Sequence, residues 1–355
     1  MTDFTSLYSN SNQQNNSLRD RYGRDRYYNS FNTDIFQPVL SHKIVQNGFR
    51  PHYPGNKKIA VCVSHDVDHL FSNNSATKKV EALAKNLLKG RFDSAGFALR
   101  SFVKKEITAE NSLQKLKEVN EQFRIQSSYY FLSLDHSDED FNYNPADIKD
   151  ELRAVLTANC EVGLHGGHRA YNDLGKLLSE KKRLEANLGS AVKGYRNHYL
   201  RLELPLTWKN LESAGFLYDT TFCYADCVGF RNGMCYPFYP YDVIKNEFVN
   251  IIELPLIMMD ATLFYYMRLD EEGSLKLCRK IVEEIAACNG VFTLLWHNNF
   301  ISGEMGNTYR KILELLTEYD PWFATSADLT EWWRQEKLID QSHGIVEKII
   351  AADRS

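Results

Sequence analysis

From Lys58 onward the chain alternates short apolar runs with longer segments in which apolar residues recur at helical spacing. The short runs are rich in β-branched and aromatic residues and are too short for free-standing helices, so we predict that they are strands. The predicted strands are residues 59–63, 127–132, 160–164, 249–256 and 291–295. Helical periodicity is clearest in the segments between them, at residues 80–87, 148–156, 275–285 and 312–316.

Near-continuous apolar strands that are joined by helices are typical of a parallel sheet covered by helices. About seven such units favour a sheet that closes on itself. We therefore predict an α/β fold, a distorted (β/α) barrel with about seven parallel strands, over residues 51–340. The functional site of such a barrel lies at the carboxyl ends of its strands.

Both ends of the chain are expected to lie outside the barrel. Residues 1–50 are interpreted as a polar N-terminal arm and lead-in, and residues 341–355 as a C-terminal tail. Residues 1–30 are rich in Asn, Ser, Arg and Asp and contain few aliphatic residues, so we expect a mobile arm. Its aromatic residues provide a means of docking the end of the arm on the barrel.

Composition excludes several classes of protein. The net charge of −4 gives no whole-protein attraction to nucleic acid. No run approaches the ~18 apolar residues of a membrane span, and the polar opening residues lack the pattern of a signal peptide, so we expect a cytoplasmic protein. Seven cysteines fit a reducing compartment, and Cys223, Cys227 and Cys235 form no CxxC pair, so we interpret them as free thiols.

One locally basic segment, residues 78–88, is interpreted as the solvated face of a helix. Peripheral contact with anionic membrane lipids is the alternative interpretation. The oligomeric state is left open by the sequence.

Residues with metal-ligand and acid–base side chains directly follow three of the predicted strands. They occur in the segments SHDVDH (64–69), HGGH (165–168) and WHNN (296–299). Because the carboxyl ends of parallel strands meet at one edge of the sheet, we expect these side chains to gather at the site of the barrel.

The first of these segments carries two aspartates, Asp66 and Asp68. In an extended segment, residues i and i+2 point to the same side, so both carboxylates are expected to face one cavity. Two carboxylates held close together repel each other unless a cation or a shared proton lies between them. One Asp then ligates a divalent metal while the other takes a proton from water. The structural alternative is a helix cap beside a solvated carboxylate.

The histidines have several possible roles. His165 is interpreted as a metal ligand rather than a hydrogen-bonded core residue, because the two glycines after it allow a ligand to approach closely. For His168, metal binding, substrate binding and solvent exposure all stay open. His297 suits a general acid, since its ordinary pKa lies near physiological pH. Its carboxylate partner is either Asp260 or Asp219.

Arg196, His198 and Tyr199 lie together in one short segment. A guanidinium orients a carboxylate through a bidentate contact, and this is the role expected of Arg196. Tyr199 suits stacking on a sugar ring or donation of its backbone N–H to an oxyanion. An ordinary surface ion pair is the alternative role of Arg196.

These segments, in this order, resemble the polysaccharide deacetylase family, also known as the NodB-homology family or carbohydrate esterase family 4. The resemblance spans roughly residues 58–300. The segment SHDVD (64–68) resembles the first motif of the family, which implies that Asp66 is the catalytic base and Asp68 a metal ligand. The segment GLHGGH (163–168) resembles the metal-binding motif, which implies His165 and His168 as further ligands.

Two further motifs complete the resemblance. The segment YRNHY (195–199) resembles the motif in which the arginine, here Arg196, positions the base and the region of Tyr199 supplies the oxyanion donor. The segment LWH (295–297) resembles the motif that carries the acid, which implies His297 in this role. The residues expected to contact the substrate are His198, Tyr199, Arg231 and Trp296. Arg231 lies in a segment, GFRNG, that resembles a substrate-lining loop of the family.

The chain departs from the family pattern at two positions. The family spaces its two metal-binding histidines four residues apart, which would place the second at Arg169 instead of His168. The family also carries a proline where this chain has His198. The third metal ligand is therefore either His168 or His198.

The resemblance implies one divalent metal. Oxygen and nitrogen ligands suit Zn²⁺ first and also admit Co²⁺, Ni²⁺ or Mn²⁺. The implied function is metal-dependent hydrolysis of an N-acetyl group on a sugar or glycan precursor, in surface polysaccharide biosynthesis, with an acetylated amino sugar as substrate. One alternative is a catalytically degenerate protein that binds glycan or organises a biosynthetic complex, which the altered histidine spacing suggests. A second alternative is a metal-dependent hydrolase of another C–N amide bond.

Overall fold

A parallel sheet forms the centre of the protein in the computed structural model, which describes residues 4–9, 19–70 and 109–353. The strands of the sheet follow the order β8-β5-β4-β3-β2-β1-β10-β9, and β11 pairs with β1. Neighbouring strands are parallel throughout. The strands are β1 (Ala60–Val67), β2 (Ser128–Leu132), β3 (Glu161–Gly166), β4 (Gly194–Asn197), β5 (Tyr218–Asp219), β8 (Ile252–Glu253), β9 (Met258–Met259), β10 (Val291–Leu295) and β11 (Trp322–Phe323).

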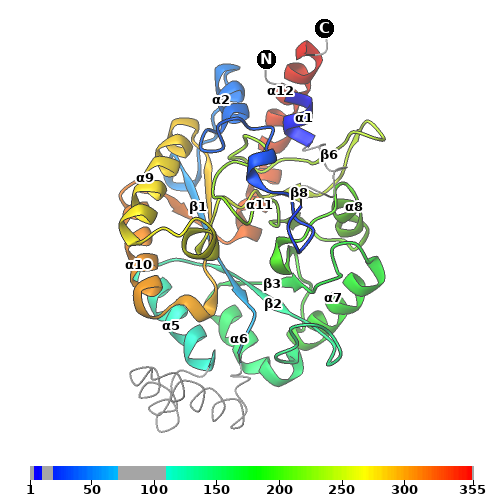
Figure 1. The fold of residues 1–355 in the computed structure, drawn as a ribbon, viewed down its shortest axis with the longest axis vertical. Helices are drawn as coiled ribbons and strands as arrows, with labels where there is room; N and C mark the ends of the chain where they lie inside the picture. Colours follow the sequence, from blue (N-terminus) through cyan, green and yellow to red (C-terminus); the bar gives the residue numbers. More distant parts are fainter. Residues whose placement is uncertain (1–3, 10–18, 71–108, 354–355) are drawn as a thin grey trace.

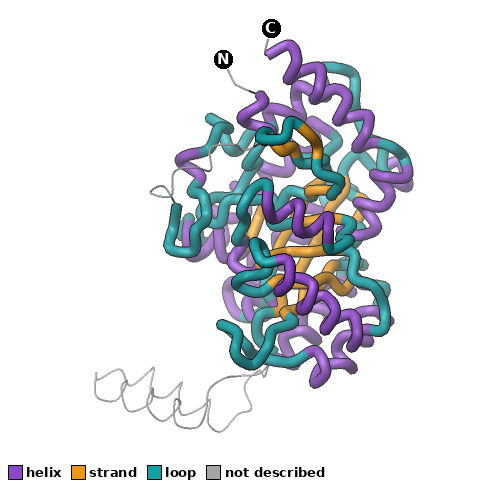
Figure 2. Tube along the Cα trace, turned by 90° about the vertical axis from the view of Figure 1, so that its right-hand side faces the viewer, coloured by secondary structure: helices purple, strands orange, loops and turns teal. Residues whose placement is uncertain are grey.

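Helices surround this sheet, as expected for strands that are apolar on both faces. They are α1 (Phe4–Ser9), α2 (Val39–Gln46), α5 (Ala109–Gln122), α6 (Lys149–Thr157), α7 (Leu174–Leu188), α8 (Leu206–Ser213), α9 (Glu271–Cys288), α10 (Gly303–Thr317), α11 (Ser326–Gln335) and α12 (Leu338–Asp353). Figure 1 shows α9 and α10 on one side of the sheet and α7 and α8 on the other. In the side view the strands run through the interior, between the helices (Figure 2). The predicted distorted α/β barrel is confirmed, with nine strands in its sheet instead of about seven.

Strand β1 is the central element of the core. All eight of its residues are buried, and it lies between β2 and β10. Ser64, in the second half of β1, is in register with Ser128 of β2 and with Leu295 of β10. This register brings the segments that follow β1 and β10 to the same edge of the sheet, so that Asp66, Asp68 and His297 meet there.

The boundaries of several elements differ from the predictions. Of the predicted strand 249–256, only β8 pairs as a ladder, since Pro255 has no N–H to continue one. Residues 338–353 form helix α12, which packs against α1 and α11, so most of the predicted tail is helical. A short antiparallel hairpin joins β6 (Tyr241–Asp242) and β7 (Glu247–Phe248). The predicted helix at 80–87 and the basic segment 78–88 lie outside the described residues.

The N-terminal segment, here meaning residues 19–30, lies against the barrel. Its Arg24 side chain is buried and hydrogen-bonded to Tyr199 and Tyr266 of the barrel. This part of the predicted mobile arm is therefore docked. None of the helices in the described part of the chain is both long enough and apolar enough to cross a bilayer.

Candidate active site

A cleft of about 420 Å³ opens at the carboxyl ends of the strands. Its deepest residues come from the ends of β1, β3 and β4 and from the segments after β9 and β10. The polar and aromatic lining residues are Arg21, Arg24, Asp66, Asp68, His69, Asp140, His165, His198, Tyr199, Tyr265, Tyr266, His297, Asn299 and Phe300. A second cavity of about 410 Å³ lies near the amino ends of β2, β3 and β4, and no histidine lines it. The acid–base and metal-ligand residues therefore gather in the first cleft.

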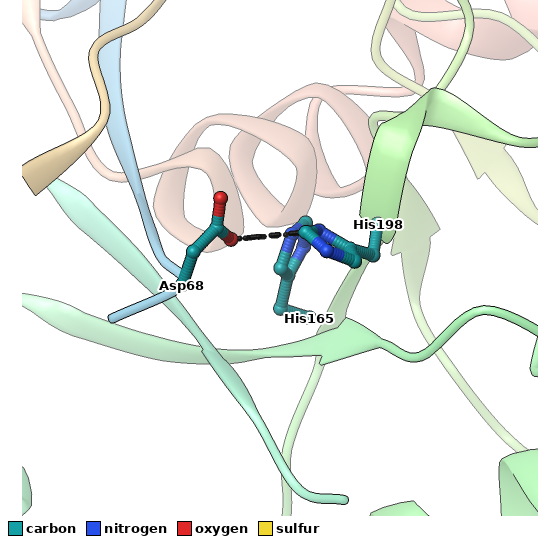
Figure 3. A group of neighbouring side chains, drawn as sticks. All are labelled: Asp68, His165 and His198. Carbon is teal, nitrogen blue, oxygen red and sulfur yellow. Dashed lines mark hydrogen bonds and ion pairs between the residues drawn. The ribbon is translucent and has the colours of Figure 1, made fainter. Parts of the chain in front are cut away.

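Asp68, His165 and His198 converge in this cleft with one ligand atom each (Figure 3). Asp68 Oδ1 lies 3.2 Å from His165 Nε2 and 3.5 Å from His198 Nδ1. The two ring nitrogens are 3.1 Å apart. One carboxylate oxygen and two imidazole nitrogens at such separations suit a tetrahedral divalent metal that keeps a further position open.

The outer nitrogens of the two imidazoles have hydrogen-bond partners that fix their tautomers. His165 Nδ1 lies 3.0 Å from the carbonyl oxygen of Arg196, so it carries the proton and donates. His198 Nε2 lies 3.3 Å from Asp140 Oδ2, where it also acts as the donor. In each ring the lone pair is then left on the nitrogen that faces Asp68. Such outer hydrogen bonds are typical of metal-binding histidines.

The carboxyl of Asp68 is held ionised. Burial by itself raises the pKa of this group, but the surrounding imidazoles, foremost that of His198, outweigh burial and hold the pKa well below its usual range. A buried carboxylate oxygen, Oδ1, accepts no regular hydrogen bond among the described residues. The donor set therefore fits a divalent cation, which would satisfy this oxygen and both ring nitrogens.

Asp66 lies beside this group and is paired with Arg196. The Arg196 guanidinium donates to Asp66 Oδ1 at 2.9 Å, and both side chains are buried. Arg196 is itself held by Ser64 and Thr220 and lies over the ring of Tyr130, with its Cζ 4.5 Å from the ring centre. A buried guanidinium stabilises the ionised form of a carboxylate that faces it.

His297 faces the same cleft from the end of β10. Its Nδ1 lies 2.7 Å from Asp260 Oδ1, and its backbone N–H donates to Asp260 Oδ2 at 2.5 Å. Burial by itself lowers the pKa of His297, but the Asp260 carboxylate outweighs burial and raises the pKa to about 10. The imidazole is therefore a cation at neutral pH, with Nε2 3.8 Å from Asp68 Oδ2.

Asp260 is thus the carboxylate that pairs with His297, whereas the sequence left both Asp260 and Asp219 open. Asp219 instead accepts hydrogen bonds from the backbone and side chain of Thr221. It lies opposite Glu253 in the sheet, and burial raises the pKa of Asp219 to about 6.

The other residues predicted to act in the site lie around this centre. His168 is outside the group that includes Asp68; its Nε2 lies 3.1 Å from Asp140 Oδ2. Asp140, His168 and His198 form a second group of potential ligand atoms. Tyr199 lines the cleft and adopts a left-handed backbone conformation with φ of 58°.

Two residues predicted to contact the substrate are buried away from the cleft. Arg231 is 5% exposed and forms an ion pair with Asp25 at 2.7 Å. Trp296 is fully buried, and its Nε1 donates to the carbonyl oxygen of Phe300. Both placements differ from the prediction. The local sequence around Arg231 and Trp296 does not indicate whether their side chains point into the cleft or into the core.

Sequence reasoning did not identify Asp140 or the N-terminal segment as parts of the site. Asp140 lies in the acidic stretch DHSDED, where no spacing distinguishes it from its neighbours. Arg21 and Arg24 lie in a polar segment that has no motif. Their position at the cleft depends on contacts with residues more than a hundred positions away.

Comparison with known proteins supports the fold. No family model matches the sequence, and no curated protein matches it significantly. A crystal structure from Mycobacterium smegmatis, of a protein assigned as a polysaccharide deacetylase, is similar with a TM-score of 0.55 and 17% identity. The match covers 81% of this chain and 94% of that chain.

More distant structures include a peptidoglycan deacetylase from Bacillus subtilis, with 11% identity and a TM-score of 0.40 over 79% of this chain and 93% of that chain. A pseudoenzyme of carbohydrate esterase family 4 from Bacillus anthracis also has 11% identity and a TM-score of 0.40, over 78% of this chain and 66% of that chain. The similarity to the Mycobacterium smegmatis structure shows that the chain has the polysaccharide deacetylase fold, as its motifs predict.

Proposed function

We propose that this protein is a metal-dependent deacetylase that hydrolyses an N-acetyl group on an amino sugar or glycan precursor, such as an intermediate of surface polysaccharide biosynthesis. One observation carries the proposal. A single cleft brings together a ligand group of Asp68, His165 and His198, a buried carboxylate paired with Arg196, and a cationic imidazole, that of His297. These are the three parts that metal-assisted hydrolysis of an amide uses.

Asp68, His165 and His198 would hold the metal, with Zn²⁺ the first choice for one carboxylate and two imidazoles. A metal bound there would supply Lewis acidity, which would polarise the acetyl carbonyl and make water a better nucleophile. In this assignment His198 is the third metal ligand, and His168 does not belong to the group of Asp68, His165 and His198.

Asp66 acts as the general base. Its ion pair with Arg196 fixes its orientation, so that its other oxygen is available to take a proton from the attacking water. Arg196 cannot rotate away, because its other nitrogens donate to Thr220.

His297 acts as the general acid. The amine that leaves from an amide must gain a proton, and His297 carries one at neutral pH because Asp260 stabilises the imidazolium. The backbone N–H of Tyr199 is proposed to stabilise the oxyanion that forms before the C–N bond breaks.

The aromatic rim of the cleft suits a sugar ring. Tyr265 and Tyr266, from the π-helical turn after β9, are 57% and 42% exposed and line the opening together with Phe300. Exposed aromatic faces bury the apolar face of a pyranose while its hydroxyls stay in water.

The test is acetate release from a panel of N-acetylated amino sugars and small acetamides, by protein loaded with Zn²⁺, after chelation, and after addition of Zn²⁺ again. We expect release from at least one sugar, loss after chelation and recovery with metal. Release from small amides alone would favour the alternative amide hydrolase. Stoichiometric metal without release from any compound would favour a degenerate protein that binds glycan.

A further inference from the structure

The N-terminal segment forms one wall of the cleft. Arg24 donates to the carbonyl oxygen of Tyr199 at 2.9 Å and to the hydroxyl of Tyr266 at 2.7 Å, which ties the segment to two residues that line the cleft. The charge of Arg24 is balanced by Asp20, whose Oδ2 lies 2.6 Å from its guanidinium. Arg24 is therefore a buried, neutralised anchor of the segment.

Further contacts fix the segment on either side of Arg24. The ring of Tyr22 stacks on that of Tyr199, with centroids 4.5 Å apart and an angle of 15° between the planes. The Arg201 guanidinium donates to the carbonyl oxygen of Tyr22 at 3.0 Å. On the far side, Asp25 pairs with the buried Arg231. These contacts place Arg21, which lies between Asp20 and Tyr22, at the rim of the cleft.

Arg21 differs from Arg24 in its charge balance. Its side chain is exposed and lines the cleft, and its Nη2 donates to the hydroxyl of Tyr22 at 2.8 Å. The guanidinium also lies over the Tyr22 ring, with Cζ 4.8 Å from the centre. No carboxylate of the described residues lies within ion-pair distance of it. Arg21 is thus a cation that is oriented by an aromatic ring but has no anionic partner in that part of the chain.

The charged residues of the cleft lie in different places, and this bears on what Arg21 could bind. Asp66 is buried and Asp68 half-buried in the part of the cleft where an acetamido group would react, whereas Arg21 is an exposed residue of the same cleft, which Tyr265 and Tyr266 also line. A sugar whose acetamido group reaches Asp66 and Asp68 would extend toward the exposed residues of the cleft, and Arg21 is one of them. A guanidinium in such a position binds phosphate or carboxylate through paired N–H donors.

We propose that the N-terminal segment is a substrate-recognition element and that Arg21 binds an anionic group, a phosphate or a carboxylate, carried by the acetylated sugar. This inference rests on the proposed function for the identity of the reacting group. The recognition of the anion, however, is measurable by binding alone, without turnover.

Three sugars test the proposal: N-acetylglucosamine 1-phosphate, N-acetylglucosaminuronic acid and the neutral methyl glycoside of N-acetylglucosamine. Their affinities would be measured by calorimetry on the full chain after removal of metal, and acetate release would be measured on the metal-loaded protein. The variants are Arg21→Ala and the matched control Arg26→Ala, which removes an exposed arginine of the same segment that does not line the cleft.

We expect the wild type to bind at least one anionic sugar more tightly than the neutral glycoside. Arg21→Ala is expected to weaken that binding by about tenfold to a hundredfold, as for loss of a charged hydrogen bond, and to leave the neutral glycoside unaffected. Arg26→Ala should change neither. Preference for only one of the two anionic sugars shows which anionic group, the phosphate on C1 or the carboxylate on C6, reaches Arg21.

Equal affinity of the wild type for neutral and anionic sugars would overturn the inference. An equal loss on both kinds of sugar in Arg21→Ala would also overturn it. Acetate release without any preference for anionic sugars leaves the proposed function standing and removes this inference. Binding of an anionic sugar through Arg21 without acetate release would support the recognition of the anion and would contradict the proposed deacetylase function.

Discussion

The imidazole of His198 is hydrogen-bonded to Asp140 through the ring nitrogen that points away from Asp68, with Nε2 3.3 Å from Asp140 Oδ2. Asp140 also accepts a hydrogen bond from the hydroxyl of Tyr199. Burial raises the pKa of Asp140, but hydrogen bonding to His198 is the larger effect and holds that pKa well below its usual range. This carboxylate therefore stays ionised and keeps the proton of His198 on Nε2, which leaves Nδ1 free to face Asp68.

The first prediction concerns the third metal ligand. His198→Ala should lose nearly all bound metal, whereas Asp140→Ala should weaken metal affinity by about tenfold to a hundredfold, because it removes only the partner that orients the ligand. His168→Ala is the matched control, since His168 also contacts Asp140 but lies outside the group with Asp68. Metal per chain is measured by elemental analysis after dialysis against a zinc buffer. Metal lost in His168→Ala as completely as in His198→Ala would instead assign the ion to the second group, Asp140, His168 and His198.

The second prediction concerns the general base. Asp66→Asn should lower turnover by ~10²–10⁴-fold and leave metal content unchanged, because an amide oxygen still accepts from Arg196 but no longer takes a proton. Glu139→Gln, in an exposed position near His168, is a control for the loss of one negative charge. Appreciable turnover by Asp66→Asn would remove the assignment of Asp66 as the base.

The third prediction concerns the general acid. His297→Gln should lower the hydrolysis of an acetamido sugar by ~10²–10⁴-fold, because the amine leaves without a proton donor. Asp260→Asn should act in the same direction with a smaller loss, since it removes the charge that stabilises the imidazolium. The loss should shrink on 4-nitrophenyl acetate, whose leaving phenolate needs no proton. If both variants lose the same factor on both substrates, His297 has a structural role rather than this one.

The fourth prediction concerns stability and pH. Glu180 is fully buried and accepts a hydrogen bond from the backbone N–H of Gly167. Burial raises the pKa of Glu180 to about 8. Between its ordinary pKa and 8, the folded state keeps a proton that the unfolded state has released, so stability falls as pH rises through this window. The loss is on the order of a few kcal/mol. Below the window both states are protonated and the effect is absent.

Glu180→Gln should remove this dependence. Thermal unfolding would be measured from pH 5 to pH 8 for the wild type, for Glu180→Gln and for Glu336→Gln, whose side chain is exposed. We expect the melting temperature of the wild type to fall relative to that of Glu180→Gln as pH rises, and that of Glu336→Gln to follow the wild type. Parallel curves for the wild type and Glu180→Gln would show that Glu180 does not titrate in this range.

Local sequence determined the parts of the protein that depend on short segments. The apolar runs of β1, β2, β3 and β10 were predictable because a strand that is buried on both faces must be apolar over several consecutive residues. The polar residues that follow those runs were predictable as site residues, since parallel strands end at one edge of the sheet. Asp66, Asp68, His165 and His297 follow from these two rules, and the order of the motifs indicated the fold.

Only the tertiary structure decided which of these side chains meet and which partners they have. Asp140 is 58 residues from His198 in the sequence, and nothing local marks it as the partner of that ring. The choice of Asp260 over Asp219 depends on which carboxylate the sheet directs toward His297. Arg21 reaches the cleft because Arg24 and Tyr22 anchor the N-terminal segment on Tyr199. Such pairings arise from the register of strands and loops far apart in the chain, which no pattern of neighbouring residues records.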